Sequence, residues 1–208
     1  MNGNPLYATG QAICRLATTL LFDLKVQGIE HVPRKGGVLI VANHQSYLDP
    51  ILVGVKLPRA ASFLAKSELF EGRYFGGLIR MLNAFPVRQG RGDISAVREA
   101  INRLGQGSAL VLFPEGTRTE DGELIHLEAG VGLIVRKTTA PVVPCAIEGS
   151  YRAWPRRRKM FRASPIRVMF GPPMELAGLK AQQIVDAIDA TLRRMIVQLK
   201  QEIQAGDA

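Results

Sequence analysis

Short apolar runs and helix-like patterns alternate along most of the chain. Residues Val38–Ala42 form a continuous apolar run rich in β-branched side chains, which is typical of a strand buried on both faces. Similar runs predict strands at residues 61–65, 84–87, 109–113, 142–147 and 166–170. Apolar residues at helical spacing predict helices at residues 50–56, 67–82 and 94–104, the last capped by Asp93 and ending near Gly105. This alternation predicts an α/β fold in which helices flank a largely parallel central sheet.

Longer amphipathic patterns lie at the two ends of the chain. Near the N-terminus, apolar residues recur at helical spacing: Ile13, Leu16, Ala17, Leu20, Leu21 and Leu24. Such a helix suits either a protein core or a lipid interface, and the core is the more common environment. Residues 180–204 carry one apolar stripe, which predicts a long packing helix. We therefore divide the chain into an N-terminal amphipathic helix, residues 1–25, and a single domain, residues 26–208. Membrane association of the helix is left open.

Composition narrows the class of protein and of partner. With 208 residues, 47% of them apolar, the chain is long enough for one domain with a sizeable core. Its 27 Lys and Arg against 18 Asp and Glu give a net charge of +9, which favours an anionic partner such as acidic lipid, an acidic carrier protein or nucleic acid. Cys14 and Cys145 are far apart and form no ligand-like group, which predicts reduced thiols and a cytosolic location.

The sequence predicts no secretory signal, no membrane-spanning helix and no metal site. No basic leader precedes an apolar run and a cleavage site, so no secretory signal is predicted. The apolar stretch at residues 13–22 contains Arg15 and is shorter than the roughly 20 residues of a bilayer span, so we expect the protein to lie on a membrane without crossing it. The three histidines, His31, His44 and His126, are isolated from one another, and we predict no metal site.

A histidine and an aspartate follow the first predicted strand. They lie five residues apart in the segment Asn43-His44-Gln45-Ser46-Tyr47-Leu48-Asp49. On a helix this spacing separates two side chains by about 140°, so His44 and Asp49 meet only if the segment is a loop that curls back. Asp49 would then fix the imidazole tautomer and leave the other ring nitrogen free to take a proton from an alcohol. The alternatives are an ordinary N-cap at Asp49, just before Pro50, and a buried structural histidine.

Two further predicted strands end in polar segments. The segment Phe113-Pro114-Glu115-Gly116-Thr117-Arg118 follows the strand at residues 109–113 and suits a tight turn that presents backbone N–H groups and a guanidinium to an anion. The strand at residues 84–87 is followed by Arg88 and Arg91. A base, an anion-binding turn and two arginines are the groups needed to hold a phosphate monoester and deprotonate its neighbouring hydroxyl. Solvated loops with incidental ion pairs are the alternative.

Taken in order, these segments resemble the 1-acylglycerol-3-phosphate acyltransferases, the PlsC-like glycerolipid acyltransferase family. The resemblance runs from about Val26 to Ser150: residues 43–49 resemble the family's N-H-x4-D block, residues 85–88 its second block, residues 113–118 its F-P-E-G-T-R block and residues 143–144 its fourth. It implies transfer of a fatty acyl group from an acyl thioester to the free hydroxyl of a lysophospholipid. The thioester, of coenzyme A or acyl carrier protein, is a co-substrate, and no cofactor is implied.

The resemblance also implies a role for individual residues. His44 would be the general base, and Asp49 would orient and charge-stabilise it. The predicted substrate-binding residues are Asn43, Ser46, Arg88, Arg91, Glu115, Gly116, Thr117 and Arg118, with Val143 and Pro144 lining the acyl path. The implied location is the cytoplasmic face of the membrane, as a peripheral protein.

Two features leave alternatives open. Many family members carry basic residues before the glycine that follows the third block, whereas this chain has Glu128 there, which would repel a phosphate and leaves another lysolipid acceptor open. The segment Trp154–Arg162 interleaves five cations with large apolar residues, which suits an anionic leaflet, an acidic carrier protein, nucleic acid or plain solvent. A non-catalytic basic module for lipid or nucleic acid is the alternative from a different class, although no nucleic-acid-binding motif is present.

Overall fold

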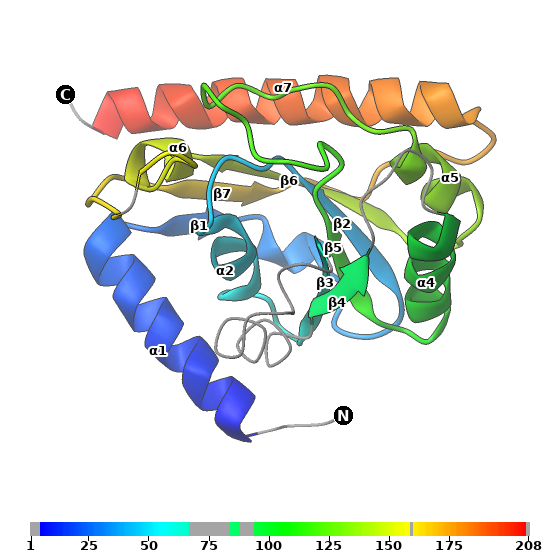
Figure 1. Ribbon diagram of the computed structural model, residues 1–208, viewed down its shortest axis with the longest axis horizontal. Coiled ribbons are helices and arrows are strands. Elements are labelled where there is room, and N and C mark those ends of the chain that lie inside the picture. The colour runs from blue at the N-terminus through cyan, green and yellow to red at the C-terminus, as the bar shows by residue number, and fades with distance from the viewer. Residues whose placement is uncertain (1–4, 67–83, 88–93, 159, 207–208) are drawn as a thin grey trace.

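One twisted sheet with helices on both faces forms the body of the protein (Figure 1). The computed structural model describes residues 5–66, 84–87, 94–158 and 160–206. Within these residues the strands are β1 (Lys25–Gln27), β2 (Val38–Ala42), β3 (Ala61–Lys66), β4 (Ala84–Val87), β5 (Ala109–Leu112), β6 (Val142–Glu148) and β7 (Arg167–Phe170). The helices are α1 (Pro5–Phe22), α2 (Asp49–Gly54), α4 (Ile94–Gly105), α5 (Gly130–Arg136), α6 (Ser150–Ala153) and α7 (Ala181–Gly206), with a 3-10 turn at Ile29–His31.

Strand order confirms the predicted α/β class and refines it. The seven described strands lie in the order β1-β7-β6-β2-β5-β3-β4. The five strands from β6 to β4 are mutually parallel, whereas β7 pairs antiparallel with β6, and β1 pairs parallel with β7. The sheet is therefore largely parallel, with two strands at one edge running in the opposite direction. A sequence pattern reports burial and not direction, which is why this reversal was not predicted.

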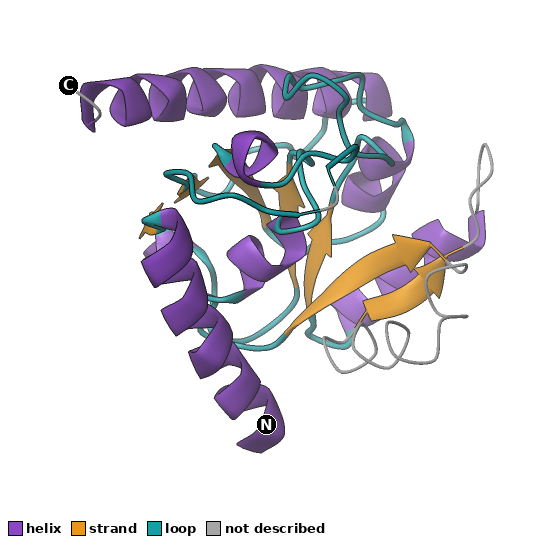
Figure 2. Cartoon of the chain, turned by 60° about the vertical axis from the view of Figure 1, so that its left-hand side comes forward, coloured by secondary structure: helices purple, strands orange, loops and turns teal. Residues whose placement is uncertain are grey.

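Alternation along the strands divides the core into two layers. In β2, Val38, Ile40 and Ala42 pack in a cluster with α2, while Leu39 and Val41 pack in a cluster with α4, α5 and α7. Every residue of β2 and β6 is buried, which explains their near-continuous apolar sequence. Figure 2 shows the helices on both sides of the strands. The central strands are thus held rigidly, and the loops at their ends start from fixed positions.

The C-terminal helix behaves as its sequence predicted. The apolar stripe of α7 is buried against the sheet: Ile184, Ile188, Leu192, Met195, Leu199 and Ile203. Helix α5, which the sequence did not predict, packs against α7. The two approach closely at Gly132, where an added Cβ would lie 2.4 Å from the carbonyl oxygen of Ala181. Gly132, which this contact requires, and Gly130 weaken the helical pattern of the seven-residue segment.

The N-terminal helix differs from its predicted packing. Although Phe22 at its end is buried, three leucines on the stripe are exposed: Leu16 by 63%, Leu20 by 75% and Leu21 by 43%. The core interpretation is therefore wrong for these positions, and α1 presents an apolar face to its surroundings. Figure 1 shows α1 running along one side of the molecule. Among the described residues, no helix combines the length and apolar character needed to cross a bilayer. The helix predicted at residues 67–82 lies outside the described residues.

Candidate active site

The polar segments singled out in the sequence lie at one edge of the sheet. The strands β2, β5 and β6 are parallel neighbours, so the loops at their carboxyl ends leave the sheet on the same side. These loops begin at Asn43, Phe113 and Gly149. The two motif loops are joined directly, because the backbone N–H of Thr119 donates to the carbonyl oxygen of His44 at 3.0 Å. Residues separated by more than seventy positions therefore build one site.

The histidine and the aspartate form a pair. Nδ1 of His44 lies 2.8 Å from Oδ2 of Asp49, and the Asp49 side chain is completely buried. The same oxygen accepts backbone N–H bonds from Gln45 at 2.6 Å and Ser46 at 2.7 Å. Helix α2 has Leu48 as its N-cap and no side-chain cap bond, so the N-cap interpretation of Asp49 is wrong. Because a carboxylate only accepts, Nδ1 carries the proton and Nε2 is left as the basic nitrogen.

An aromatic ring also packs against the His44 imidazole. The rings of Phe113 and His44 stack with their centroids 4.2 Å apart and their planes 22° from parallel. Stacking on one face and the Asp49 bond at Nδ1 together fix the orientation of the imidazole, whose side chain is 18% exposed. The sequence did not assign Phe113 to the site. The only signal that marked it was its place as the first residue of the F-P-E-G-T-R segment.

Glu115 holds the two motif loops together. One of its oxygens accepts the backbone N–H of His44 at 2.6 Å, and the other accepts that of Ile125 at 3.1 Å. Burial raises the pKa of Glu115 to about 7, although these two hydrogen bonds oppose that rise. The side chain is only 4% exposed. Its atoms therefore contact the protein, which gives Glu115 a positioning role in place of the predicted substrate contact.

Asn43 and Ser46 also bind the protein itself. The side chain of Asn43 makes a pair of bonds with the backbone of Ile147 on the neighbouring strand, at 2.9 and 2.7 Å. Ser46 donates its hydroxyl to the carbonyl oxygen of Trp154 at 2.8 Å and accepts the N–H of Leu48. Both side chains are buried. Both side chains thus fix the loop of residues 43–48 between β2 and α2, called the catalytic loop below, whereas the sequence suggested contact with substrate.

The turn at Gly116–Arg118 contains a glycine with positive φ and an arginine whose guanidinium stacks on Tyr47. Gly116 adopts φ +65°, a backbone conformation that favours glycine, and its N–H bonds to the carbonyl oxygen of Phe113 at 3.1 Å. Thr117 is half-buried beside it. The Arg118 guanidinium lies 3.5 Å from the centre of the Tyr47 ring, and its Nη1 is a buried atom with no hydrogen-bond partner among the described residues. This is the group best placed in the turn to bind an anion.

Two of the predicted site residues, Val143 and Pro144, lie on opposite faces of the sheet. Arg88 and Arg91 fall outside the described residues. Val143 is buried in the cluster that contains α2, whereas Pro144 lines a cavity of about 470 Å³ beside α7 on the other face of the sheet. Successive residues of a strand point to opposite faces, so Val143 and Pro144 do not line one path. The predicted shared acyl path is wrong for this pair.

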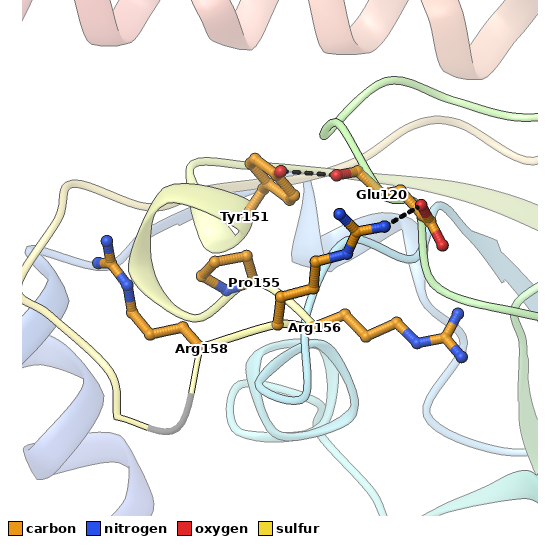
Figure 3. A pocket seen from close by; sticks show the side chains of 6 residues that line it. Glu120, Tyr151, Pro155, Arg156 and Arg158 are labelled. Carbon is orange, nitrogen blue, oxygen red and sulfur yellow. Dashed lines mark hydrogen bonds and ion pairs between the residues drawn. The ribbon is translucent and has the colours of Figure 1, made fainter.

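A basic loop borders the site beyond α6. Tyr151, Pro155 and the three arginines 156–158 line a cavity of about 260 Å³ with Glu120. Figure 3 shows Arg156 and Arg158 pointing to opposite sides of Pro155. Nη2 of Arg157 forms an ion pair with Oε2 of Glu120 at 2.8 Å, and the Tyr151 hydroxyl donates to the backbone carbonyl oxygen of Glu120 at 2.7 Å. The three arginines therefore point in different directions, and Arg157 is paired with Glu120. In the part of the chain that the structure describes, no group of three or more His, Cys, Asp or Glu is arranged to hold a metal ion.

Comparison with known proteins agrees with this geometry. The acyltransferase family profile matches residues 23–148. The chain is 28% identical over 193 residues to a 1-acyl-sn-glycerol-3-phosphate acyltransferase of Bacillus subtilis, covering 91% of this chain and 94% of the relative. It is 28% identical to the chloroplastic 1-acyl-sn-glycerol-3-phosphate acyltransferase BAT2 of Brassica napus, covering 79% of this chain and 48% of that one.

A solved structure shares the fold. The crystal structure of the 1-acyl-sn-glycerophosphate (LPA) acyltransferase PlsC from Thermotoga maritima superposes with a TM-score of 0.80 at 28% identity, covering 93% of this chain and 80% of that chain. The family match spans the catalytic loop, the anion-binding turn and β6, which are the segments that build the site described above. The chain therefore belongs to the acyltransferase family, as its motifs predicted, and is an O-acyltransferase like the 1-acylglycerol-3-phosphate acyltransferases that it resembles.

Proposed function

We propose that the enzyme moves a fatty acyl group from an acyl thioester to the free hydroxyl of 1-acylglycerol 3-phosphate, giving phosphatidate for phospholipid biosynthesis. The observation that carries this proposal is the His44–Asp49 pair, 2.8 Å apart, on the loop that also places Tyr47 against Arg118. A base and a phosphate-binding cation on joined loops match a substrate that carries a hydroxyl and a phosphate. Membership of an acyltransferase family decides against the non-catalytic binding module.

The first chemical step uses the unbonded nitrogen of His44. Asp49 keeps the proton on Nδ1, so Nε2 accepts the proton of the acceptor hydroxyl as that oxygen attacks the thioester carbonyl carbon. The imidazolium that forms is stabilised by the buried Asp49 carboxylate. General-base assistance of this kind contributes roughly 10²- to 10⁴-fold in rate.

The second step restores the base. The tetrahedral intermediate collapses by breaking the carbon–sulfur bond, and the departing thiolate takes the proton from Nε2 of His44. The new ester and a free thiol leave, with atoms and charge balanced. No acyl-enzyme is needed in this sequence, so His44 and Asp49 return to their starting states after each transfer. The proposed donor is acyl coenzyme A or acyl carrier protein, and the chemistry calls for no resident cofactor.

The proposed acceptor site is the turn that ends in Arg118. Its guanidinium suits a phosphate through paired, charge-assisted hydrogen bonds, and the N–H group of Thr117 lies in the same turn. We propose that Arg88 and Arg91 add to this charge. Glu128 favours the alternative acceptor, because its Cγ lies 3.6 Å from the Cβ position that a side chain at Gly116 would have. A carboxylate beside the turn suits a lysolipid with a less anionic headgroup.

We also propose that the protein works as a peripheral protein on an anionic membrane surface, at its cytoplasmic face. The exposed leucines of α1 adjoin the basic loop, because Phe22 at the end of α1 packs edge-on against Phe161 with centroids 5.8 Å apart. Met160 in the same loop is 74% exposed. Exposed apolar side chains next to a loop with three exposed arginines suit the boundary between headgroups and acyl chains.

The proposed function is tested by mixing the protein with a long-chain acyl coenzyme A and lysophosphatidate in mixed micelles. Thiol release and phosphatidate formation are followed for the wild type, His44→Ala and the control His31→Ala, since His31 bonds the backbone of Phe170 and not the site. We expect His44→Ala to lose at least about 10²-fold in kcat with its fold intact. Undiminished turnover by this variant would contradict the proposed base, and turnover only with other lysolipids would replace the acceptor.

A further inference from the structure

Tyr47 contacts the Arg118 end of the anion-binding turn from the catalytic loop. It lies between His44 and Asp49 in the sequence and is 45% exposed. Its ring carries the Arg118 guanidinium 3.5 Å from the ring centre, a distance at which cation–π attraction is strong. The contact holds the guanidinium by its flat face. A contact with the face of the ring uses none of the guanidinium N–H groups.

The other contact of Tyr47 explains why its ring is fixed. The Trp154 ring packs against it with centroids 5.6 Å apart, and the backbone oxygen of Trp154 accepts the Ser46 hydroxyl at 2.8 Å. Ser46 is itself held by Asp49 through its backbone N–H. The Tyr47 ring is therefore packed against linked residues of the catalytic loop and the end of α6; we call Ser46, Asp49 and Trp154 the frame behind the ring. A flexible arginine that stacks on a fixed ring loses less freedom when an anion binds.

Arg118 depends on this ring for its position. Among the described residues it has no carboxylate partner, and its buried Nη1 has no hydrogen-bond partner. A buried donor without a partner is costly, and a bound phosphate would remove that cost. Within the described part of the chain, the Tyr47 ring is thus the side-chain contact that orients the guanidinium.

We infer that Tyr47 is a positioning residue for the acceptor phosphate, which acts by stacking on Arg118 and aiming its free N–H groups at the ligand. This inference rests on the proposed function. It places part of the selectivity for a phosphate-bearing acceptor on an aromatic ring of the catalytic loop. Since the ring acts on Arg118, and His44 is held separately by Asp49 and Phe113, its loss should weaken binding of the acceptor and leave the chemical step nearly intact.

The test compares Tyr47→Leu with Tyr47→Phe, which keeps the ring. For Tyr47→Leu we expect KM for lysophosphatidate to rise about three- to tenfold, with kcat within about twofold of wild type. The KM for the acyl donor should stay unchanged, and Tyr47→Phe should match the wild type. Trp154 is the only tryptophan of the chain, so its emission reports whether the frame behind the ring survives in each variant.

A double variant isolates the stacking. In an Arg118→Gln background, Tyr47→Leu should change KM for lysophosphatidate by less than about twofold, because the partner of the ring is gone. The inference is overturned if Tyr47→Leu leaves this KM unchanged, if it shifts the acceptor and donor KM equally, or if its effect persists in the Arg118→Gln background. Absence of lysophosphatidate turnover in the wild type would instead overturn the proposed function, and this inference with it.

Discussion

The two sides of the candidate site differ in how their polar groups are held. On the side of the base, Asp49, Glu115 and the backbone of His44 are bound by protein hydrogen bonds of 2.6 to 3.1 Å. On the side of the turn, Arg118 has a single ring contact, and Arg156 and Arg158 of the basic loop are exposed and point to opposite sides of Pro155. The base must meet one oxygen at one angle, whereas headgroups and membrane surfaces vary. The side chains that place the reacting atoms are therefore held more tightly than those proposed to bind the headgroup and the membrane.

Loosening the rigid side should have the largest effect. Glu115→Gln leaves one acceptor oxygen for two backbone N–H groups and turns an amide NH₂ toward the other donor. We expect kcat to fall roughly 10- to 100-fold and the free energy of unfolding to fall by about 1 to 3 kcal/mol. Steady-state rates and urea denaturation measure the two effects. Glu99→Gln on α4, where Glu99 forms a half-buried i,i+4 pair with Arg103, is the matched control.

The same variant gives a pH prediction. Burial raises the pKa of Glu115 from 4.5 to about 7, so the native state binds the extra proton between these values. The stability that this proton contributes is present below pH 4.5 and is lost as the pH rises through 7. The unfolding free energy of the wild type minus that of Glu115→Gln should therefore fall with pH, by at most about 3 kcal/mol. A difference that is flat or rises with pH would mean that the two hydrogen bonds outweigh burial.

Changing the charge on the open side should have a smaller effect. Replacing Glu128 by Lys removes a carboxylate beside the Gly116 turn and adds a cation. We expect KM for lysophosphatidate to fall about two- to fivefold at low salt, with the gain shrinking at high salt because exposed charges are screened. Glu175→Lys makes the same charge change in the cavity beside α7. If both variants behave alike, the acceptor responds to net charge and not to the position of Glu128.

Removing the outermost cations should change turnover least. The triple variant Arg156→Ala, Arg157→Ala and Arg158→Ala should keep its micellar kcat within about twofold, while its partition onto anionic vesicles weakens about tenfold or more at low salt. Arg157 contributes less than its neighbours because Glu120 already pairs with it. The control removes Arg34, Lys35 and Lys137, three exposed cations that precede β2 and β6 at the other edge of the sheet. Equal partition of both triple variants would reject the basic loop as the docking surface.

Much of the fold was readable from the sequence because burial leaves a pattern. The strands at Val38–Ala42 and Ala84–Val87 match their predicted bounds, and α7 buries its predicted stripe. The elements that were missed are short or carry glycine: β1 has three residues, α6 has four, and α5 has two glycines in seven. The exposed leucines of α1 were misassigned because an apolar stripe is the same whether a core or another apolar surface covers it.

The sequence by itself determined the α/β class and the family, and it singled out His44 as the proposed base, because apolar periodicity and ordered motifs are local properties of the chain. Only the tertiary structure decided which side chains face one another. It brought Phe113 onto the His44 ring, turned Asn43, Ser46 and Glu115 inward, and put Val143 and Pro144 on opposite faces. It also set Tyr47 under Arg118. These contacts join residues that are distant in the chain, and strand pairing fixes them in a way that no local pattern records.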